Sequence, residues 1–193
     1  MLHNLLLPFA GAAFVASGGD TKELNNHHEH PVQKYAFDFV GVAAAFSRRW
    51  VGDGTRNEDY FFFGRPILSP LDGVVVEAVD GIRDNQPKQI YERMLSGNYV
   101  LIKHQDSVFS HLSHLKFGTV SVKAGETVKS GMVIGHCGNS GRSTEPHLHF
   151  HIQSADRADA PVALKCWFRR VRLENEIRTD YSPVRGDIVQ NEA

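Results

Sequence analysis

Apolar and polar residues alternate along most of the chain, in short runs separated by glycine and proline. Alternating runs include Tyr35–Val40, Gly73–Val79, Asn98–His104 and Lys165–Leu173, with shorter ones around Val120, Val128 and Val133. Period-two alternation between closely spaced turn residues is typical of β-strands. Helical periodicity is weak, and only residues 81–95 are compatible with a short helix or a long irregular loop. The pattern predicts a mainly β protein built on a largely antiparallel sheet or sandwich.

Turn residues divide the chain further. Four glycines within residues 118–135 are expected to mark successive tight turns between short strands, namely Gly118, Gly125, Gly131 and Gly135. The apolar first twenty residues lack the basic segment of a secretory signal peptide, and no apolar run is long enough to cross a bilayer. We interpret them as an opening strand followed by a turn at Gly18 and Gly19, and expect the targeting segment of an exported protein to lie outside this sequence. The last residues are expected to fray.

Composition limits the class of protein. The chain has 193 residues, 41% of them hydrophobic and 22% charged, which fits one globular domain. Its formal net charge of −1 gives no basic face for nucleic acid. The two cysteines, Cys137 and Cys166, form neither a disulfide framework nor a thiolate metal site, and each is expected to be a small buried apolar residue.

Histidine is the residue type that indicates chemistry. There are eleven histidines, and His147, His149 and His151 occupy alternate positions of an expected strand, so their imidazoles share one face. Neutral imidazole is a favoured zinc ligand, although a solvent-facing row of histidines on an edge strand would give the same spacing. A turn over residues 138–143 and Pro146 lead into this strand, and other His and Asp residues lie upstream.

Three segments carry a resemblance to a known family. They are Asn-Asn-His-His-Glu-His at residues 25–30 followed by Asp38, Phe-Ser-His-Leu-Ser-His-Leu at 109–115, and Pro-His-Leu-His-Phe-His at 146–151. Together they resemble the lysostaphin/LytM-type zinc endopeptidases of the peptidase M23 family. The resemblance runs in order from about Pro8 to Ile152 and includes the stretches at 68–75, 97–104 and 138–144. It implies the lysostaphin-type β fold, related to duplicated hybrid motifs.

The resemblance also implies a ligand set. His149 and Asp38 would bind zinc, and a histidine of the 27–30 cluster would be the third ligand. The gap between this cluster and the aspartate is longer than is usual in the family, so His27, His28 and His30 all remain candidates. We favour His27 because the Asn-x-His opening fits a subgroup with longer spacing, and His30 is the alternative.

Two further histidines would be catalytic. The resemblance makes His147 a base or proton shuttle, and a second catalytic histidine is either His114 or His111, each followed by leucine. The register of the downstream segment favours His114 and puts His111 one strand face away. Glu145 stands where the family usually has a small residue, and His151 where it often has glutamate, so substrate preference is in question more than catalysis.

Smaller assignments concern residues around these histidines. Asn139 and Ser143 are expected to satisfy backbone groups of their turn. The aromatic run at residues 60–63 is expected in the core rather than along a substrate groove, and Arg48 and Arg169 on solvated faces.

These elements predict the activity. Two histidines and one aspartate leave an open position on a tetrahedral zinc ion, whereas a fourth protein ligand would make a structural site. We therefore predict a zinc-dependent endopeptidase that hydrolyses an amide, organised as one domain over residues 1–193 with a core at about 8–152 and a C-terminal extension at 153–193. The resemblance implies peptidoglycan cross-links as substrate and a location in the cell envelope or outside the cell.

Two other classes of function fit parts of the sequence. One is a catalytically silent M23-like domain that regulates a cell-wall amidase, and the other is a carrier domain with similar glycine-punctuated turns. A silent domain usually lacks ligands, and this chain has a candidate for each. A carrier has no use for the upstream His and Asp residues. Zinc content separates the enzyme from both alternatives.

Overall fold

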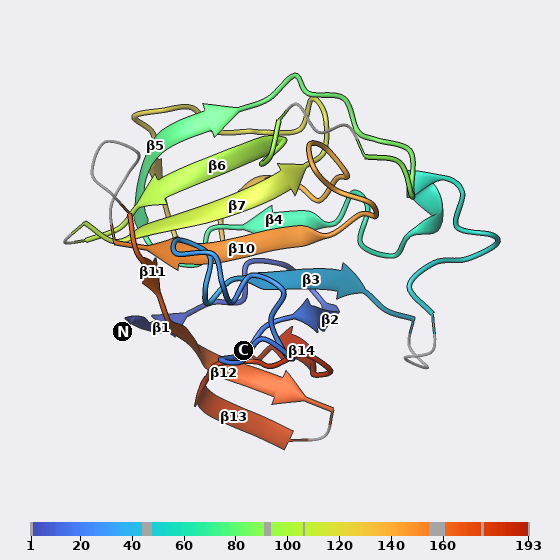
Figure 1. The fold of residues 1–193 in the computed structure, drawn as a ribbon. Helices are drawn as coiled ribbons and strands as arrows, with labels where there is room; N and C mark the ends of the chain where they lie inside the picture. The colour runs from blue at the N-terminus through green and yellow to red at the C-terminus, as the bar shows by residue number, and fades with distance from the viewer. Residues whose placement is uncertain are drawn as a thin grey trace.

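Strands form nearly all the regular structure of the chain (Figure 1). The computed structural model describes residues 2–43, 48–90, 94–105, 107–154, 161–174 and 176–192. The strands are β1 (Leu2–Leu5), β2 (Ala12–Ser17), β3 (Phe37–Gly41), β4 (Pro66–Leu68), β5 (Gly73–Val79), β6 (Asn98–Lys103), β7 (Phe109–Leu115), β8 (Thr127–Val128), β9 (Val133–His136), β10 (Leu148–Gln153), β11 (Ala163–Leu164), β12 (Cys166–Leu173), β13 (Glu176–Tyr181) and β14 (Ile188–Asn191). One 3-10 turn, η1, covers Asn57–Asp59. The mainly β prediction is confirmed.

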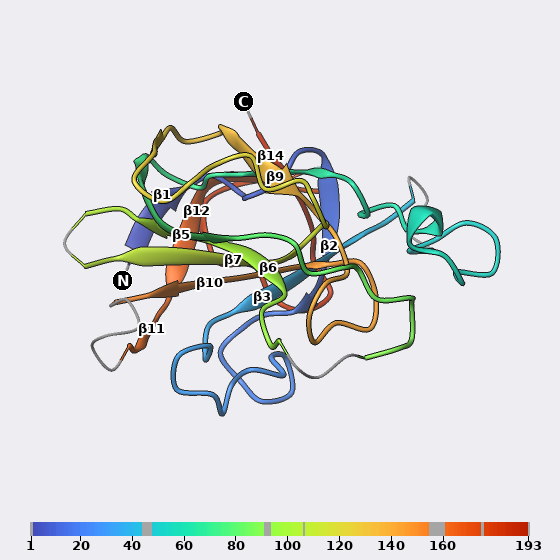
Figure 2. The same cartoon turned by 90° about the horizontal axis from the view of Figure 1, so that it is seen from above.

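The strands of the described residues form one large sheet and one small sheet. The large sheet has the order β1-β12-β14-β2-β3-β10-β7-β6-β5-β8, with β11 added to β10 and β13 to β12, and β4 pairs with β9 in the small sheet. Within the large sheet only β1 and β12 run parallel; the other described pairs are antiparallel. Seen from above, the large sheet is strongly curled rather than flat (Figure 2).

Alternation along β3 and β10 separates a core face from a polar face. Phe37 and Phe39 of β3 and Phe150 of β10 are at most 2% exposed, and the ring centroids of Phe37 and Phe39 lie 5.5 Å apart. The residues between them, Asp38 and His149, point to the opposite face, because successive strand side chains alternate. The apolar set that holds the sheet together therefore also fixes which residues face the functional site.

The core includes the aromatic run at 60–63. Tyr60 is 5% exposed and Phe62 is fully buried, with the ring of Phe62 5.5 Å from that of Phe9. This agrees with the prediction of a core position. Cys137 and Cys166 are both buried and free, as expected for small apolar residues.

Several strand predictions hold, and others are wrong. β5 has the predicted bounds, and β12 begins at Cys166, one residue later than predicted. Val120 lies outside any strand, and Gly135 lies within β9 rather than at a turn, whereas Gly118, Gly125 and Gly131 have φ values of 72°, 91° and 84°. In residues 81–95, the described part is irregular, and 91–93 lie outside the described residues.

The last residues were predicted to fray, but Ile188–Asn191 form a paired strand, β14. β14 pairs with β2 and β12, and β12 pairs with β1, so the C-terminal strands extend the sheet that β2 and β3 begin. Phe168 and Val171 of β12 and Val189 of β14 are fully buried. This apolar burial stabilises the C-terminal strands against fraying. None of the helical segments in the described ranges is long and apolar enough to cross a membrane.

Candidate metal centre and active site

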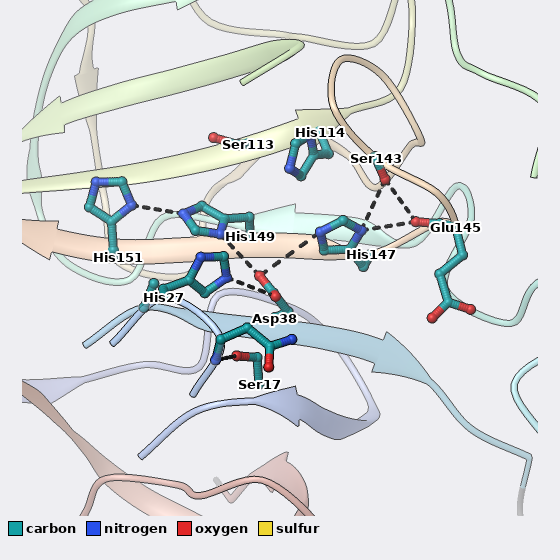
Figure 3. Close-up of polar contacts among 12 residues, drawn as sticks. Ser17, His27, Asp38, Ser113, His114, Ser143, Glu145, His147, His149 and His151 are labelled. Carbon is teal, nitrogen blue, oxygen red and sulfur yellow. Dashed lines mark hydrogen bonds and ion pairs between the residues drawn. The ribbon is translucent and has the colours of Figure 1, made fainter. Parts of the chain in front are cut away.

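Three predicted ligands meet on the polar face of the sheet. The Nε2 atom of His27 lies 2.8 Å from Oδ2 of Asp38, and Nδ1 of His149 lies 3.0 Å from Oδ1 of the same carboxylate (Figure 3). The three potential ligand atoms all lie within 4.8 Å of one another. Two imidazole nitrogens and a carboxylate oxygen at this spacing form a donor set that can hold one metal ion.

The register of β3 and β10 positions two of these residues. In the antiparallel pairing of β3 and β10, Asp38 lies directly opposite His149, so both side chains leave the same face of the sheet. The exposed fractions of the two side chains are only 17% and 7%. The carboxylate and the imidazole are therefore set side by side by backbone hydrogen bonds, with little water around them.

A buried asparagine positions the third residue, His27. Asn25 is fully buried, and its Nδ2 group donates to the carbonyls of Gly19, Lys34 and Ala36, each at 3.1 Å. Its Oδ1 accepts the backbone N–H of His27 at 3.0 Å. These bonds fold the long segment between the His cluster and β3 into a compact loop, which brings His27 to Asp38 despite their separation in sequence.

The carboxylate of Asp38 stays ionised at the centre of this cluster. Burial opposes its negative charge, but hydrogen bonding from His149 and His27 outweighs burial and holds the pKa of Asp38 well below its usual range. Burial, followed by the neighbouring rings of His27 and His147, lowers the pKa of His149, and the carboxylate of Asp38 only partly offsets this. Burial also lowers the pKa of His27, but the contact with Asp38 raises it more. A buried anion flanked by two ring nitrogens suits a cation.

A β-bulge brings His114 to the same face. Ser113 of β7 lies opposite His149 of β10, so strict alternation would send the side chain of His114 toward the core. On the other side of β7, Tyr99 pairs with Ser113 and Asn98 with Leu115, which leaves His114 as the extra residue, at a φ of 63°. The bulge and the left-handed backbone re-aim the ring toward the site. Its centroid lies 4.6 Å from that of His147.

A hydrogen bond to one backbone carbonyl sets the tautomer of His114. Its Nδ1 lies 2.8 Å from the carbonyl oxygen of Ser140, and because a carbonyl only accepts, Nδ1–H donates. The neutral ring therefore presents an unprotonated Nε2. Burial, followed by the neighbouring rings of His147 and His149, keeps the pKa of His114 well below its usual range, so the neutral form prevails near pH 7.

His147 is oriented in a similar way. Its Nδ1 lies 2.9 Å from the carbonyl oxygen of Glu145, which also accepts the hydroxyl of Ser143 at 2.9 Å. The Nε2 atom of His147 faces Oδ1 of Asp38 at 3.9 Å. Ser143 thus satisfies a backbone carbonyl of its turn, as predicted, and the same turn holds His147 beside the donor set. Asn139 likewise donates from Nδ2 to the carbonyl of Asn85.

The other predicted histidines lie around this group. His30 lines the cavity of about 380 Å³ that contains His27, His114 and His149, without joining the donor set. His111 lies opposite His151, so it shares the face of His149 and lies farther along it; the prediction that it lies on the other face is wrong. It contacts His151 at a centroid distance of 4.9 Å, and this pair lies two residues along the strands from Ser113 and His149.

Sequence reasoning missed a chain of hydrogen bonds behind His149. Nε2 of His149 lies 3.0 Å from Nδ1 of His151, and Nε2 of His151 lies 3.0 Å from Oε1 of Gln153. Since the amide oxygen only accepts, His151 donates from Nε2 and accepts at Nδ1 from His149. This keeps a proton on Nε2 of His149, so Nδ1, the nitrogen that lies against the Asp38 carboxylate, is the atom that would give up its proton to bind a metal. The alternate spacing of residues 149, 151 and 153, which puts their side chains on one face of the strand, could have indicated this chain.

Replacing His151 with alanine is expected to weaken metal binding by about 10- to 100-fold, because His149 loses the acceptor that orients it. His151→Glu should retain most of the affinity, since a carboxylate can accept the same N–H. Competition against a chelator of known affinity measures both variants, with His111→Ala as the matched control on the same face. Wild-type affinity in His151→Ala would show that the hydrogen-bond chain does not orient the ligand.

Comparison with known proteins agrees with the geometry. The model of peptidase family M23 matches residues 59–161, more than half of the chain. The chain belongs to peptidase family M23. A protein of Haemophilus influenzae described as an uncharacterized metalloprotease is 36% identical over 105 residues, which make up 53% of this chain and 19% of that protein. The peptidoglycan DD-endopeptidase ShyA of Vibrio cholerae is 35% identical over 106 residues, or 52% of this chain and 21% of ShyA.

The fold of this M23 chain also resembles a solved structure. Lysostaphin from Staphylococcus simulans has a TM-score of 0.50 and 20% identity, with 83% of this chain and 51% of the lysostaphin chain covered. The resemblance to the M23 family is thereby confirmed for sequence and fold. The chain spans about a fifth of the length of the two curated relatives named above.

Proposed function

We propose that this chain is a zinc-dependent endopeptidase that hydrolyses peptide cross-links of bacterial peptidoglycan. The observation that carries the proposal is the convergence of His27, Asp38 and His149, with two more imidazoles, His114 and His147, beside them. Membership in peptidase family M23 supports peptide hydrolysis. The substrate is inferred from relatives such as ShyA, which also support a place in the cell envelope or outside the cell.

The donor set fits zinc. Two histidines and one aspartate, with no fourth His, Cys, Asp or Glu in the group among the described residues, make a three-ligand site with an open position. When bound, zinc supplies a Lewis acid that polarises an amide carbonyl and lowers the pKa of water toward about 7. The hydrogen-bond chain from His149 to Gln153 keeps a proton on Nε2 of His149, so Nδ1 is the nitrogen that would bind zinc.

His147 and His114 handle protons in the proposed reaction. His147 holds its proton on Nδ1, so its bare Nε2 can accept a proton from the attacking water and return it to the leaving amine. His114 also presents a bare Nε2, so its neutral ring accepts a hydrogen bond, and it donates to a developing oxyanion only after taking up a proton.

Metal removal tests the proposal. Wild-type protein should carry about one equivalent of zinc, release it to a chelator, and lose hydrolysis of cross-linked peptidoglycan fragments until zinc is restored. Mass spectrometry of the products identifies the bond that is cleaved. Unchanged hydrolysis in metal-free protein would rule out the proposed chemistry. Zinc binding without hydrolysis, together with stimulation of a cell-wall amidase, would instead indicate the regulatory alternative.

A further inference from the structure

A second cavity lies beside the proposed active site. It has a volume of about 560 Å³, and we call it the Arg48 cavity; its lining residues are Arg48, Arg49, Trp50, Gly52 and Glu145. The cavity of about 380 Å³ that contains the metal ligands is called the His27 cavity. The two share no lining residue. Figure 3 places His27 and His149 on one side of His147 and Glu145 on the other.

Glu145 connects this second cavity to the catalytic histidine. Its carbonyl oxygen accepts Nδ1–H of His147 at 2.9 Å, while its carboxylate accepts from Nη1 of Arg49 at 2.6 Å. In Figure 3 the carboxylate points away from His147. The residue that orients His147 is therefore also a wall of the Arg48 cavity, so a single residue links the cavity to the proposed active site. A small residue, usual at this position in the family, would supply no such wall.

The aromatic wall of the Arg48 cavity is held rigidly. The ring of Trp50 packs against that of Tyr60 at 5.4 Å, and the Tyr60 hydroxyl donates to the carbonyl of Gly54 at 3.1 Å. A Cβ at Gly54 would lie 2.7 Å from the indole, so the loop packs directly on the ring. Trp50 is only half-buried, which leaves part of its surface open. A preorganised aromatic surface loses little conformational entropy when a ligand packs on it.

The cavity also carries an unmatched positive charge. Arg49 is neutralised by Glu145, whereas the exposed side chain of Arg48 forms no ion pair within the part of the chain that the structure describes. Arginine binds carboxylates through paired N–H groups. An exposed arginine elsewhere is usually only solvated, as predicted from sequence, but this one lines a cavity next to His147. The chemistry favours an anionic ligand with apolar surface beside its carboxylate.

We infer that the Arg48 cavity binds a carboxylate-bearing arm of the peptide substrate, on the opposite side of the scissile amide from the His27 cavity. Arg48 binds the carboxylate, and Trp50 packs on the neighbouring aliphatic atoms. The inference rests on the proposed function and adds to it a substrate class, namely acidic peptides. An endopeptidase has to hold its substrate on both sides of the cleaved bond, and the two cavities on either side of His147 provide for this.

Kinetics of Arg48→Ala in the zinc-loaded full chain test the inference. The substrate is a cross-linked peptidoglycan fragment with free carboxylates, compared with the same fragment after amidation. We expect KM for the acidic fragment to rise about tenfold, the scale of a lost charge-assisted hydrogen bond, with kcat within about twofold. The amidated fragment should not distinguish the variant from wild type. Arg169→Ala, which removes an exposed arginine of β12, is the matched control and should behave as wild type.

A binding measurement separates this inference from the proposed function. In a Trp167→Phe background, Trp50 is the one remaining tryptophan, so its fluorescence reports binding of the acidic fragment to chelator-treated protein. Binding that Arg48→Ala weakens, in a protein that hydrolyses nothing when zinc-loaded, would support the cavity and overturn the proposed function. Hydrolysis by wild type with equal KM values in Arg48→Ala would overturn the cavity assignment alone.

Discussion

Asp38→Ala and His149→Ala are expected to lower zinc affinity by more than about a hundredfold, since outer-shell partners alone contribute about 10- to 100-fold. Each change removes a metal bond. Asp38→Ala also removes the anion to which His27 and His149 are both hydrogen-bonded. Zinc stoichiometry after equilibration with a competing chelator measures the effect. The sheet should stay intact in both variants, because the core residues on its other face are unchanged. Circular dichroism checks this.

The upstream histidines provide the control for this experiment. His27→Ala should lose zinc like the other two ligand variants, whereas His30→Ala should keep it, although both residues line the same cavity. His30 lies outside the group of converging ligand atoms in the described residues. Full zinc binding in His27→Ala together with loss in His30→Ala would transfer the ligand role to His30. Wild-type affinity in Asp38→Ala would refute the whole donor set.

The local sequence pattern was sufficient to predict which residues face the core and which face the site at the centre of the sheet. Phenylalanines at 37, 39 and 150 alternate with Asp38 and His149, and burying the aromatic set leaves one face for the polar pair. Period-two alternation carries this information directly, because a register slip of one residue would bury the polar residues. The same alternation, continued along β10, places His151 beside His149.

Other parts depend on contacts that no local pattern encodes. Alternation alone sends His114 to the core, and only the bulge between β6 and β7 turns it back. The bulge arises from how two strands pair, so its position is not written in either strand alone. The pairing of β1 with β12 and of β14 with β2 likewise joins residues at opposite ends of the chain, so the local pattern predicted β12 but not that the last residues pair in the sheet.

The compact loop at 25–36 was partly predictable from local sequence and partly dependent on tertiary contacts. The Asn-x-His spacing pointed to His27, and in the structure the Asn25 side chain accepts the backbone N–H of that residue. Its three donated bonds to distant carbonyls required the fold. The sequence therefore pointed to the region that lies beside Asp38 but left three histidines open, and the structure brings His27 to Asp38.

Separating metal binding from catalysis requires variants that keep zinc. His147→Ala and His114→Ala should each retain about one equivalent, because neither ring belongs to the group of converging ligand atoms in the described residues. Hydrolysis of a cross-linked peptidoglycan fragment should nevertheless slow by roughly a hundredfold or more, the scale for losing an acid-base group or an oxyanion donor. His114→Asn is a second variant at the bulge, because asparagine tolerates the left-handed backbone there.

His111 is the matched control for these two variants. It lies on the same face as His149, but its ring contacts His151 rather than the metal ligands, so His111→Ala should keep both zinc and most of the activity. Zinc content and turnover measured on all three alanine variants decide the assignment. Loss of activity in His111→Ala with near wild-type turnover in His114→Ala would exchange their roles. Three active variants would remove the proposed proton transfers, while the donor set of His27, Asp38 and His149 would stand on its own metal-binding test.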